Sequence, residues 1–309
     1  MEPSLNWLFK LRDLIVSSLQ ERKLPLPVDR ELCNKWQEGL PSRGVKRVFY
    51  TSCMYQLAPA IYKAVESLEK FGVAKGGVAA RLAAVGAKLL GGVVLRPERE
   101  DLERSYTIVR SIYTALFNSG VEIGYLPDEP YSGALLYELG FIDDFAKYAS
   151  EVYAYFKEKG VREVVTIDPH THYILEKIYP QYVPDFDLKV TSYLDLIDPS
   201  RVRVKISGFT IHDSCLYARY LGKYGKIREL LSKGSPAEDP YITGVETAGC
   251  CGGPVESILP ELAKKIALGR AKKLASLSRV VVATCPICMV NLSRTGVVEV
   301  KHLAEAVEL

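Results

Sequence analysis

The sequence predicts an α/β protein made of two similar domains, each a small parallel sheet flanked by helices. Short apolar runs alternate with longer segments of helical periodicity, an order typical of parallel sheets that are covered on both faces. The two halves also repeat the same succession of motifs, and a length of 309 residues is typical of two domains. The predicted strands cover residues 46–51, 121–125, 163–167, 203–206, 245–246 and 280–283.

Residues 1–45 are expected to form a helical N-terminal extension, in which Cys33 and Trp36 serve packing. A first domain is predicted over residues 46–185. It carries a helical insertion near residues 72–103, where apolar residues recur at near-helical spacing and form a stripe. We interpret this stripe as a docking surface for another subunit. Packing inside the domain and attachment to a membrane surface are the alternatives.

A long amphipathic helix is predicted directly after the insertion. Between residues 102 and 117, apolar side chains fall on one helical face, and residues 118–120 supply a stop signal. The passage from one half to the other is expected at residues 184–199. A second domain is predicted over residues 200–309.

Three pairs of segments relate the two halves, as expected if one α/β unit was duplicated. In the first pair, a cysteine stands just past a strand. In the second pair, a strand is followed by a proline at the start of a helix. The matched pairs are 46–60 with 206–220, 161–175 with 277–291, and 128–140 with 247–259.

The composition is that of an ordinary globular protein. Hydrophobic residues make up 48% and charged residues 25%, and a net charge of +3 gives no support to nucleic acid binding. Four charges among the first 19 residues argue against a secretory signal, and the longest apolar tract, residues 82–95, is too short to cross a bilayer. We therefore expect a cytoplasmic protein without a transmembrane segment. Only four Asn and four Gln favour a thermophilic source.

Five of the seven cysteines lie after residue 214. Each follows a strand, so thiols from three loops are expected to meet where the carboxyl ends of parallel strands share an edge. Thiolates are soft ligands that select zinc or iron–sulfur clusters. A zinc site or a cubane cluster closes with four ligands, so five cysteines indicate a larger centre or one cysteine that is not a ligand. The order is Cys215, thirty-four residues, Cys250 and Cys251, thirty-three residues, Cys285, two residues, Cys288.

The motifs HDSC (212–215), CCGG (250–253) and CPIC (285–288) at these intervals resemble the cysteine-rich CCG domain of the heterodisulfide reductase catalytic subunit. Relatives of that subunit are the iron–sulfur subunits of glycolate, lactate and glycerol-3-phosphate dehydrogenases. The resemblance covers residues 40–309. It implies two CCG domains related by a pseudo-twofold axis, and a noncubane [4Fe-4S] cluster in which one thiolate bridges two irons. The ligands that it implies are Cys215, Cys250, Cys251, Cys285 and Cys288.

The first copy of the motif keeps only Cys53. We therefore expect one cluster, bound by the second domain. A smaller metal on Cys53, Asp168 and His170 or His172 is one alternative for the first site, and a polar vestige or a wall that lines the substrate is the other. The positions that correspond to the lost cysteines hold Tyr131, Ser132, Asp168 and Thr171.

The resemblance implies an oxidoreductase: an iron–sulfur redox subunit of a heterodisulfide-reductase-like complex that acts on a small-molecule disulfide or thiol. His212, one turn before Cys215, is a candidate catalytic residue that donates a hydrogen bond to a cluster sulfur or moves a proton. A buried structural histidine is the alternative. Cys53 is the second candidate, because the pseudo-twofold axis places it on the wall opposite the cluster.

Electrons are expected to come from a partner, since the N-terminal region lacks the ferredoxin-type cysteine runs that fused family members carry. The partner is a ferredoxin-like iron–sulfur subunit, with a flavoprotein behind it. The chain is expected to be active only as part of this complex. A partner subunit can attach it to the periphery of a membrane. Two other functions stay open: an electron-transfer subunit of a glycolate, lactate or glycerol-3-phosphate dehydrogenase-like complex that passes electrons to quinone, and a non-catalytic scaffold stabilised by zinc.

Overall fold

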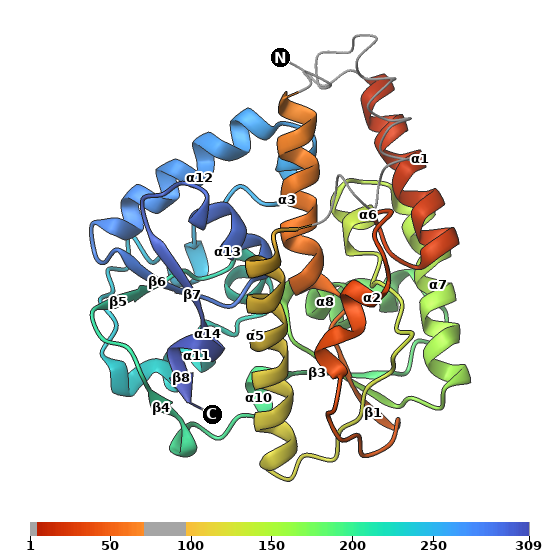
Figure 1. Ribbon diagram of the computed structural model, residues 1–309, viewed down its shortest axis with the longest axis horizontal. Coiled ribbons are helices and arrows are strands. Elements are labelled where there is room, and N and C mark those ends of the chain that lie inside the picture. Colours follow the sequence, from red (N-terminus) through yellow and green to blue (C-terminus); the bar gives the residue numbers. More distant parts are fainter. Residues whose placement is uncertain (1–4, 71–96, 309) are drawn as a thin grey trace.

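The structure is a computed structural model that describes residues 5–70 and 97–308. Figure 1 shows two lobes side by side, with helices α3 (Met54–Lys70) and α5 (Arg99–Asn118) running between them. Each lobe contains one small parallel sheet flanked by helices, which confirms the predicted fold class. The apolar stripe of the predicted insertion lies outside the described residues.

The two sheets have the same strand order and direction. In the first lobe, β1 (Arg47–Tyr50), β2 (Glu163–Thr166) and β3 (Lys189–Ser192) pair in that order, all parallel. In the second lobe, β5 (Phe209–Ile211), β6 (Val280–Ala283) and β7 (Glu299–His302) do the same. In both sheets, the loops that follow the first two strands carry the residues of the matched motifs. A separate antiparallel pair joins β4 (Arg203–Val204) to β8 (Val307–Glu308).

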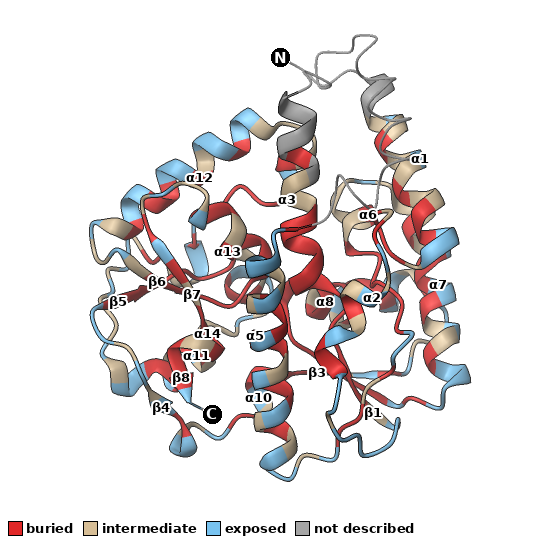
Figure 2. Ribbon diagram, viewed as in Figure 1, coloured by how far each residue is buried: buried red, intermediate tan, exposed pale blue. Residues whose placement is uncertain are grey.

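Helices flank both sheets, and the predicted helix over residues 102–117 is confirmed as α5, which buries Tyr106, Val109 and Ile112 on one face. Buried residues concentrate in the first turns of α3 and around α8 and α13, where the lobes meet (Figure 2). The other helices are α1 (Leu5–Arg22), α2 (Glu31–Asn34), α6 (Ala134–Glu138), α7 (Ile142–Glu158), α8 (Pro169–Tyr173), α9 (Tyr179–Tyr182), α10 (Tyr193–Leu196), α11 (Tyr224–Leu231), α12 (Pro260–Ala275), α13 (Pro286–Ser293) and α14 (Leu303–Ala306). Short 3₁₀ or π turns are η1 (Lys35–Gln37), η3 (Ile174–Ile178), η4 (Pro199–Arg201), η5 (Leu216–Tyr220), η6 (Ser232–Gly234), η7 (Val245–Thr247) and η8 (Pro254–Ser257).

Some predicted strands were wrong. Residues 121–125 form a single bridge, between Gly124 and Val48, and residues 245–246 lie in the 3₁₀ turn η7, because Gly244 before them has a φ of +81° and turns the chain. The strand predicted at 203–206 exists as β4 but pairs with β8 outside the parallel sheet. The sheet strand that leads to Cys215 is β5 instead. The third strand, β3, lies within the segment expected to join the halves, so the first sheet extends to Ser192.

The lobes are held together by buried contacts from α3 and α5. The hydroxyl of Tyr55, in the first turn of α3, lies 2.7 Å from Nε2 of His302 in the second lobe. Arg104 of α5 donates to both carboxylate oxygens of Glu305 in α14 and to the backbone carbonyl of Val300. The buried apolar side chains accordingly form one cluster that continues through both lobes.

The N-terminal extension packs on the first lobe as a helical segment. The Trp36 ring is fully buried and contacts the rings of Phe49 and Tyr113, with centroids 5.3 and 5.6 Å away. Cys33 does more than the packing expected of it, because it forms a disulfide with Cys53. The bond fastens α2 to the loop after β1. Among the described helices, none combines the length and apolar character needed to cross a membrane.

The loop after β1 has an unusual backbone. Ser52 and Cys53 both have positive φ values, 50° and 55°, which cost free energy in residues with a side chain. Two hydrogen bonds brace the turn: the backbone N–H of Cys53 donates to Thr51 Oγ1, and the hydroxyl of Thr51 donates to Glu129 Oε1. Glu129 also accepts from the backbone N–H of Thr51. This buried carboxyl group therefore fixes the strand end that carries Cys53.

The buried carboxyl group of Glu129 predicts a pH dependence of stability. Burial raises the pKa of Glu129 from 4.5 to about 8, although bonds from Thr51 oppose the shift. Between these two pH values the Glu129 carboxyl group is ionised in the unfolded chain and neutral in the folded protein. Its contribution to the free energy of unfolding is therefore complete below pH 4.5. It falls as the pH rises, by up to about 1.4 kcal/mol per pH unit. We expect Glu129→Gln to remove this slope in urea unfolding measured from pH 4.5 to 8.

A matched control is Glu158→Gln, at the exposed end of α7, which should keep the wild-type slope. An unchanged slope in Glu129→Gln would contradict the assignment of this carboxyl group.

Candidate metal centre

The five cysteines after residue 214 converge, as the spacing predicted, from three loops of the second lobe. Cys215 follows β5, and the Cys250 and Cys251 pair lies between η7 and η8. Cys285 and Cys288 lie at the start of α13, where the Cys285 sulfur is the N-terminal cap and accepts the backbone N–H of Cys288 at 3.4 Å. Pro286 takes the first helical position, where a missing N–H has no cost.

The thiols form a continuous chain of contacts. Cys250 is in hydrogen-bond contact with Cys215 and Cys251, and Cys288 is in hydrogen-bond contact with Cys251 and Cys285. Cys251, Cys285 and Cys288 are buried, whereas Cys215 and Cys250 are half-buried. The sulfur group therefore has a closed side toward the protein and one edge, at Cys215 and Cys250, that solvent can reach.

The pattern of hydrogen bonds separates the thiols into two kinds. The bonds from Cys215 and then Cys251 lower the pKa of Cys250 to about 2, and the backbone N–H of Gly252 adds a further bond at 3.3 Å. Burial opposes ionisation of Cys285, but bonds from Cys288 and His170 lower its pKa to about 5. The pKa values of the other three thiols, Cys215, Cys251 and Cys288, are raised. A lowered thiol pKa favours the thiolate form that binds a soft metal.

The glycine after the vicinal pair is required by the packing. Gly252 has a φ of +86°, and a Cβ atom placed there would lie 2.6 Å from the backbone oxygen of Ala263 in α12. Any other residue would strain the turn and push the loop away from α12. Gly252 therefore lets the loop with Cys250 and Cys251 lie directly on this helix.

His212 lies at the sulfur group and is held by an arginine that the sequence did not single out as its partner. Nε of Arg270 donates to His212 Nδ1 at 3.2 Å, so the imidazole proton is on Nε2, which has no partner among the described residues. Burial and then Arg270 lower the pKa of His212 to about 3. The ligand atoms of His212, Cys251 and Cys288 lie within 4.8 Å of one another. A neutral imidazole with an unpaired Nε2–H therefore lies beside the buried thiols.

The first lobe repeats the scaffold of this site with different side chains. Asp168 caps α8 by accepting the backbone N–H groups of His170 and Thr171, both at 2.9 Å, just as Cys285 caps α13. Pro169 occupies the first helical position, as Pro286 does. This agrees with the predicted matching of the two motifs.

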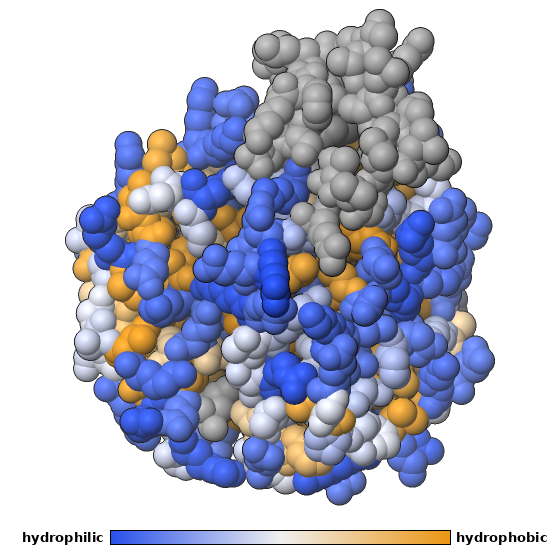
Figure 3. All heavy atoms as spheres, in the orientation of Figure 1, coloured by the Kyte–Doolittle hydropathy of each residue, from blue (hydrophilic) through white to orange (hydrophobic). Residues whose placement is uncertain are grey.

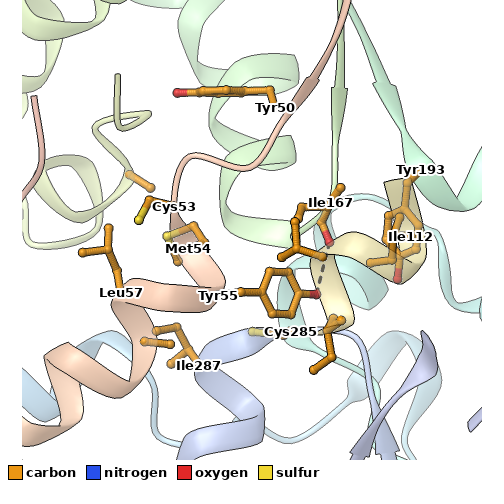
Figure 4. Close-up of a cluster of buried hydrophobic side chains, with 14 of the residues drawn as sticks. Tyr50, Cys53, Met54, Tyr55, Leu57, Ile112, Ile167, Tyr193, Cys285 and Ile287 are labelled. Atoms are coloured by element: carbon orange, nitrogen blue, oxygen red, sulfur yellow. Dashed lines mark hydrogen bonds between the residues drawn. The ribbon is translucent and has the colours of Figure 1, made fainter. Parts of the chain in front are cut away.

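The smaller metal site considered for the first lobe is not formed by the described residues, because the Cys53 sulfur is bonded to Cys33. Figure 4 shows the Cys53 sulfur pointing away from Tyr55 and Cys285, on the other side of α3. His172 contacts Thr166 Oγ1 through Nδ1 at 2.7 Å, within its own lobe. Cys53 therefore has no free thiol and does not face Cys285, unlike the wall position expected of it.

His170 reaches across to the second lobe, which sequence reasoning missed. Its Nε2 lies 3.4 Å from the sulfur of Cys285, and its Nδ1 lies 2.5 Å from Oε1 of Glu138 at the end of α6. Burial opposes its charge, but Glu138 and Cys285 together raise the pKa of His170 above its ordinary value. The available signal was its place inside a motif matched to CPIC, which brings it to the corresponding edge of the first sheet.

Comparison with known proteins agrees with the assignment of the second lobe. Residues 209–293, which hold all five free cysteines, match the CCG family of cysteine-rich domains. The expected resemblance to this domain is thereby confirmed. No solved structure is significantly similar to the chain.

Two curated proteins are similar to the chain. One is a probable iron-sulfur-binding oxidoreductase FadF of Bacillus subtilis (strain 168), 28% identical over 202 residues, which are 61% of this chain and 28% of that protein. The other is an EtfAB:quinone oxidoreductase of Syntrophomonas wolfei subsp. wolfei (strain DSM 2245B / Goettingen), 23% identical over 209 residues, 62% of this chain and 29% of that protein. The matched part is less than a third of either relative.

Proposed function

We propose that the chain is an iron–sulfur redox subunit of a heterodisulfide-reductase-like complex, in which a noncubane [4Fe-4S] cluster exchanges electrons with a disulfide or thiol substrate. The observation that carries the proposal is the convergence of five thiols from three loops in one contact chain. Zinc and cubane sites use four protein ligands, so a set of five favours a larger centre. When bound, the cluster supplies one-electron chemistry, and Cys215, Cys250, Cys251, Cys285 and Cys288 hold it.

The accessible edge of the thiol group fits a small sulfur substrate. Cys251, Cys285 and Cys288 keep water from one side, while the half-buried Cys215 and Cys250 leave room for a partner on the other. We assign His212 as a hydrogen-bond donor at the sulfurs rather than as a proton carrier, because Arg270 occupies its Nδ1. Cys53 was expected to line the substrate site, but its sulfur is in a disulfide. We assign the lining of the site to the first lobe without a role for the Cys53 thiol.

Electrons come from outside the described residues in this proposal. Apart from the five converging thiols, the cysteines of the chain are Cys33 and Cys53, which are bonded to each other. A second iron–sulfur relay therefore has no thiols here. The two relatives are more than three times as long as the matched segment, which agrees with a function that needs further domains or subunits. A ferredoxin-like subunit, with a flavoprotein behind it, would supply them.

A second candidate is electron transfer toward quinone. It is favoured by the similarity to an EtfAB:quinone oxidoreductase. In that case the same five-thiol site would relay electrons and would not bind a substrate sulfur. The two functions differ in the final acceptor, which turnover measures directly.

Serine substitutions should divide the cysteines into two groups. Cys251→Ser, Cys285→Ser or Cys288→Ser replaces a soft thiolate by a hard alcohol and should lose or convert the cluster. The wild-type protein, purified anaerobically, should be brown with about four irons per chain. Iron analysis and visible absorption check both results.

The matched control is the double variant Cys33→Ser/Cys53→Ser, which removes the disulfide without leaving a free thiol and should keep its iron. Iron near eight per chain, or iron lost in this control, would contradict a single cluster on the second lobe. A colourless protein that contains zinc and stays folded would instead support the scaffold alternative.

Turnover by the complex purified from its native host should favour disulfides. With reduced viologen as donor, we expect disulfide reduction that exceeds reduction of a quinone analogue and that disappears in Cys288→Ser. Reduction of the quinone analogue alone would replace the proposed function by the second candidate.

A further inference from the structure

The first lobe, which keeps only Cys53 of the motif cysteines, still contributes to the thiol site. His170 belongs to α8 of the first lobe, yet its Nε2 lies 3.4 Å from the sulfur of Cys285 in the second lobe. The contact is enclosed, because His170 is 5% exposed and Cys285 is 2% exposed. Water therefore does not compete for this sulfur on the side that faces the first lobe.

Two neighbours, Asp168 and Glu138, hold His170 in place. Its backbone N–H is bound by Asp168, which caps α8, and its Nδ1 is bound by Glu138 at 2.5 Å. Because Glu138 accepts from Nδ1–H, donation from Nε2 to the Cys285 sulfur requires the doubly protonated ring, an imidazolium held between a carboxylate and a sulfur. Glu138 closes α6, which follows Tyr131 and Ser132. Both members of the pair thus come from segments that match the cysteine segments of the second lobe.

A donor at a ligand sulfur changes the electronics of the metal centre. A hydrogen bond withdraws electron density from the thiolate, so it stabilises the reduced and more negative form of a cluster and raises its reduction potential. The effect is strongest where water is excluded, as it is at Cys285. His170 is not one of the five proposed ligands, and its contact with Cys285 comes from outside the thiol group.

We propose that His170, positioned by Glu138, donates a hydrogen bond to the Cys285 sulfur and sets the reduction potential of the cluster bound in the other lobe. Glu138 acts through His170 and is a positioning residue. The inference rests on the proposed iron–sulfur function. It gives the first lobe a role that does not require a metal of its own.

The test is a potentiometric titration of anaerobically purified protein, followed by electron paramagnetic resonance. His170→Ala should keep its iron and show a lower midpoint potential than the wild type. Glu138→Gln should lower the potential by a smaller amount, because the ring loses its anchor but keeps its nitrogen at the sulfur. The control is His172→Ala on the same helix, a buried histidine whose Nδ1 contacts Thr166 instead, and it should leave the potential unchanged.

An unchanged potential in an iron-replete His170→Ala variant overturns the proposal, as does an equal shift in His172→Ala. If His170→Ala fails to hold iron, the midpoint potential of Glu138→Gln is the test instead. An unchanged potential in Glu138→Gln would then contradict the proposed role of His170 and Glu138. A wild-type protein without iron refutes the proposed function separately. The hydrogen bond is then measured in the Co²⁺-loaded protein, where His170→Ala should shift the thiolate-to-cobalt absorption band and an unmoved band would refute it.

Discussion

The meeting of three loops at the carboxyl edge of one small sheet is the constraint on which the rest of the second lobe depends. Five sulfurs in mutual contact need backbone brought close from several directions, and each approach has a visible cause. Gly252 lets the vicinal pair lie on α12, the cap at Cys285 turns its sulfur inward, and Arg270 holds His212 over the group. Leu262 and Leu268 of α12 are exposed, and Figure 3 shows hydrophobic and hydrophilic residues mixed over this face of the molecule. The helix thus packs by its inner face alone.

The two lobes show how one scaffold supports two chemistries. The cap and proline at the start of α8 are the same as those of α13, so the backbone at this edge is similar in both lobes. An oxygen cap at Asp168 and a disulfide at Cys53 leave the first lobe without soft ligands at these positions. It has instead become the inner wall of the second site, through Tyr55 and His170. Loss of one metal site and support of the other are therefore compatible within the same fold.

The sequence predicted the parts of this account that depend on spacing and period. The five-thiol group followed from strand-then-cysteine spacing, and α5 followed from its apolar face. The strands β5 and β3 were not located, because β5 has three residues and β3 mixes polar with apolar residues, and Gly244 turns the chain where a strand was expected at 245–246. Contacts between distant segments were not accessible, because spacing does not reveal which side chains meet. The Cys33 disulfide and the His170 contact are both of this kind.

Diffraction from anaerobically grown crystals, with anomalous data collected on both sides of the iron edge, tests the central claim most directly. The account predicts one compact group of iron atoms bounded by Cys215, Cys250, Cys251, Cys285 and Cys288, and no iron beside Asp168 and Thr171. Iron at the first lobe, or an anomalous signal at the five thiols that belongs to zinc, would contradict it.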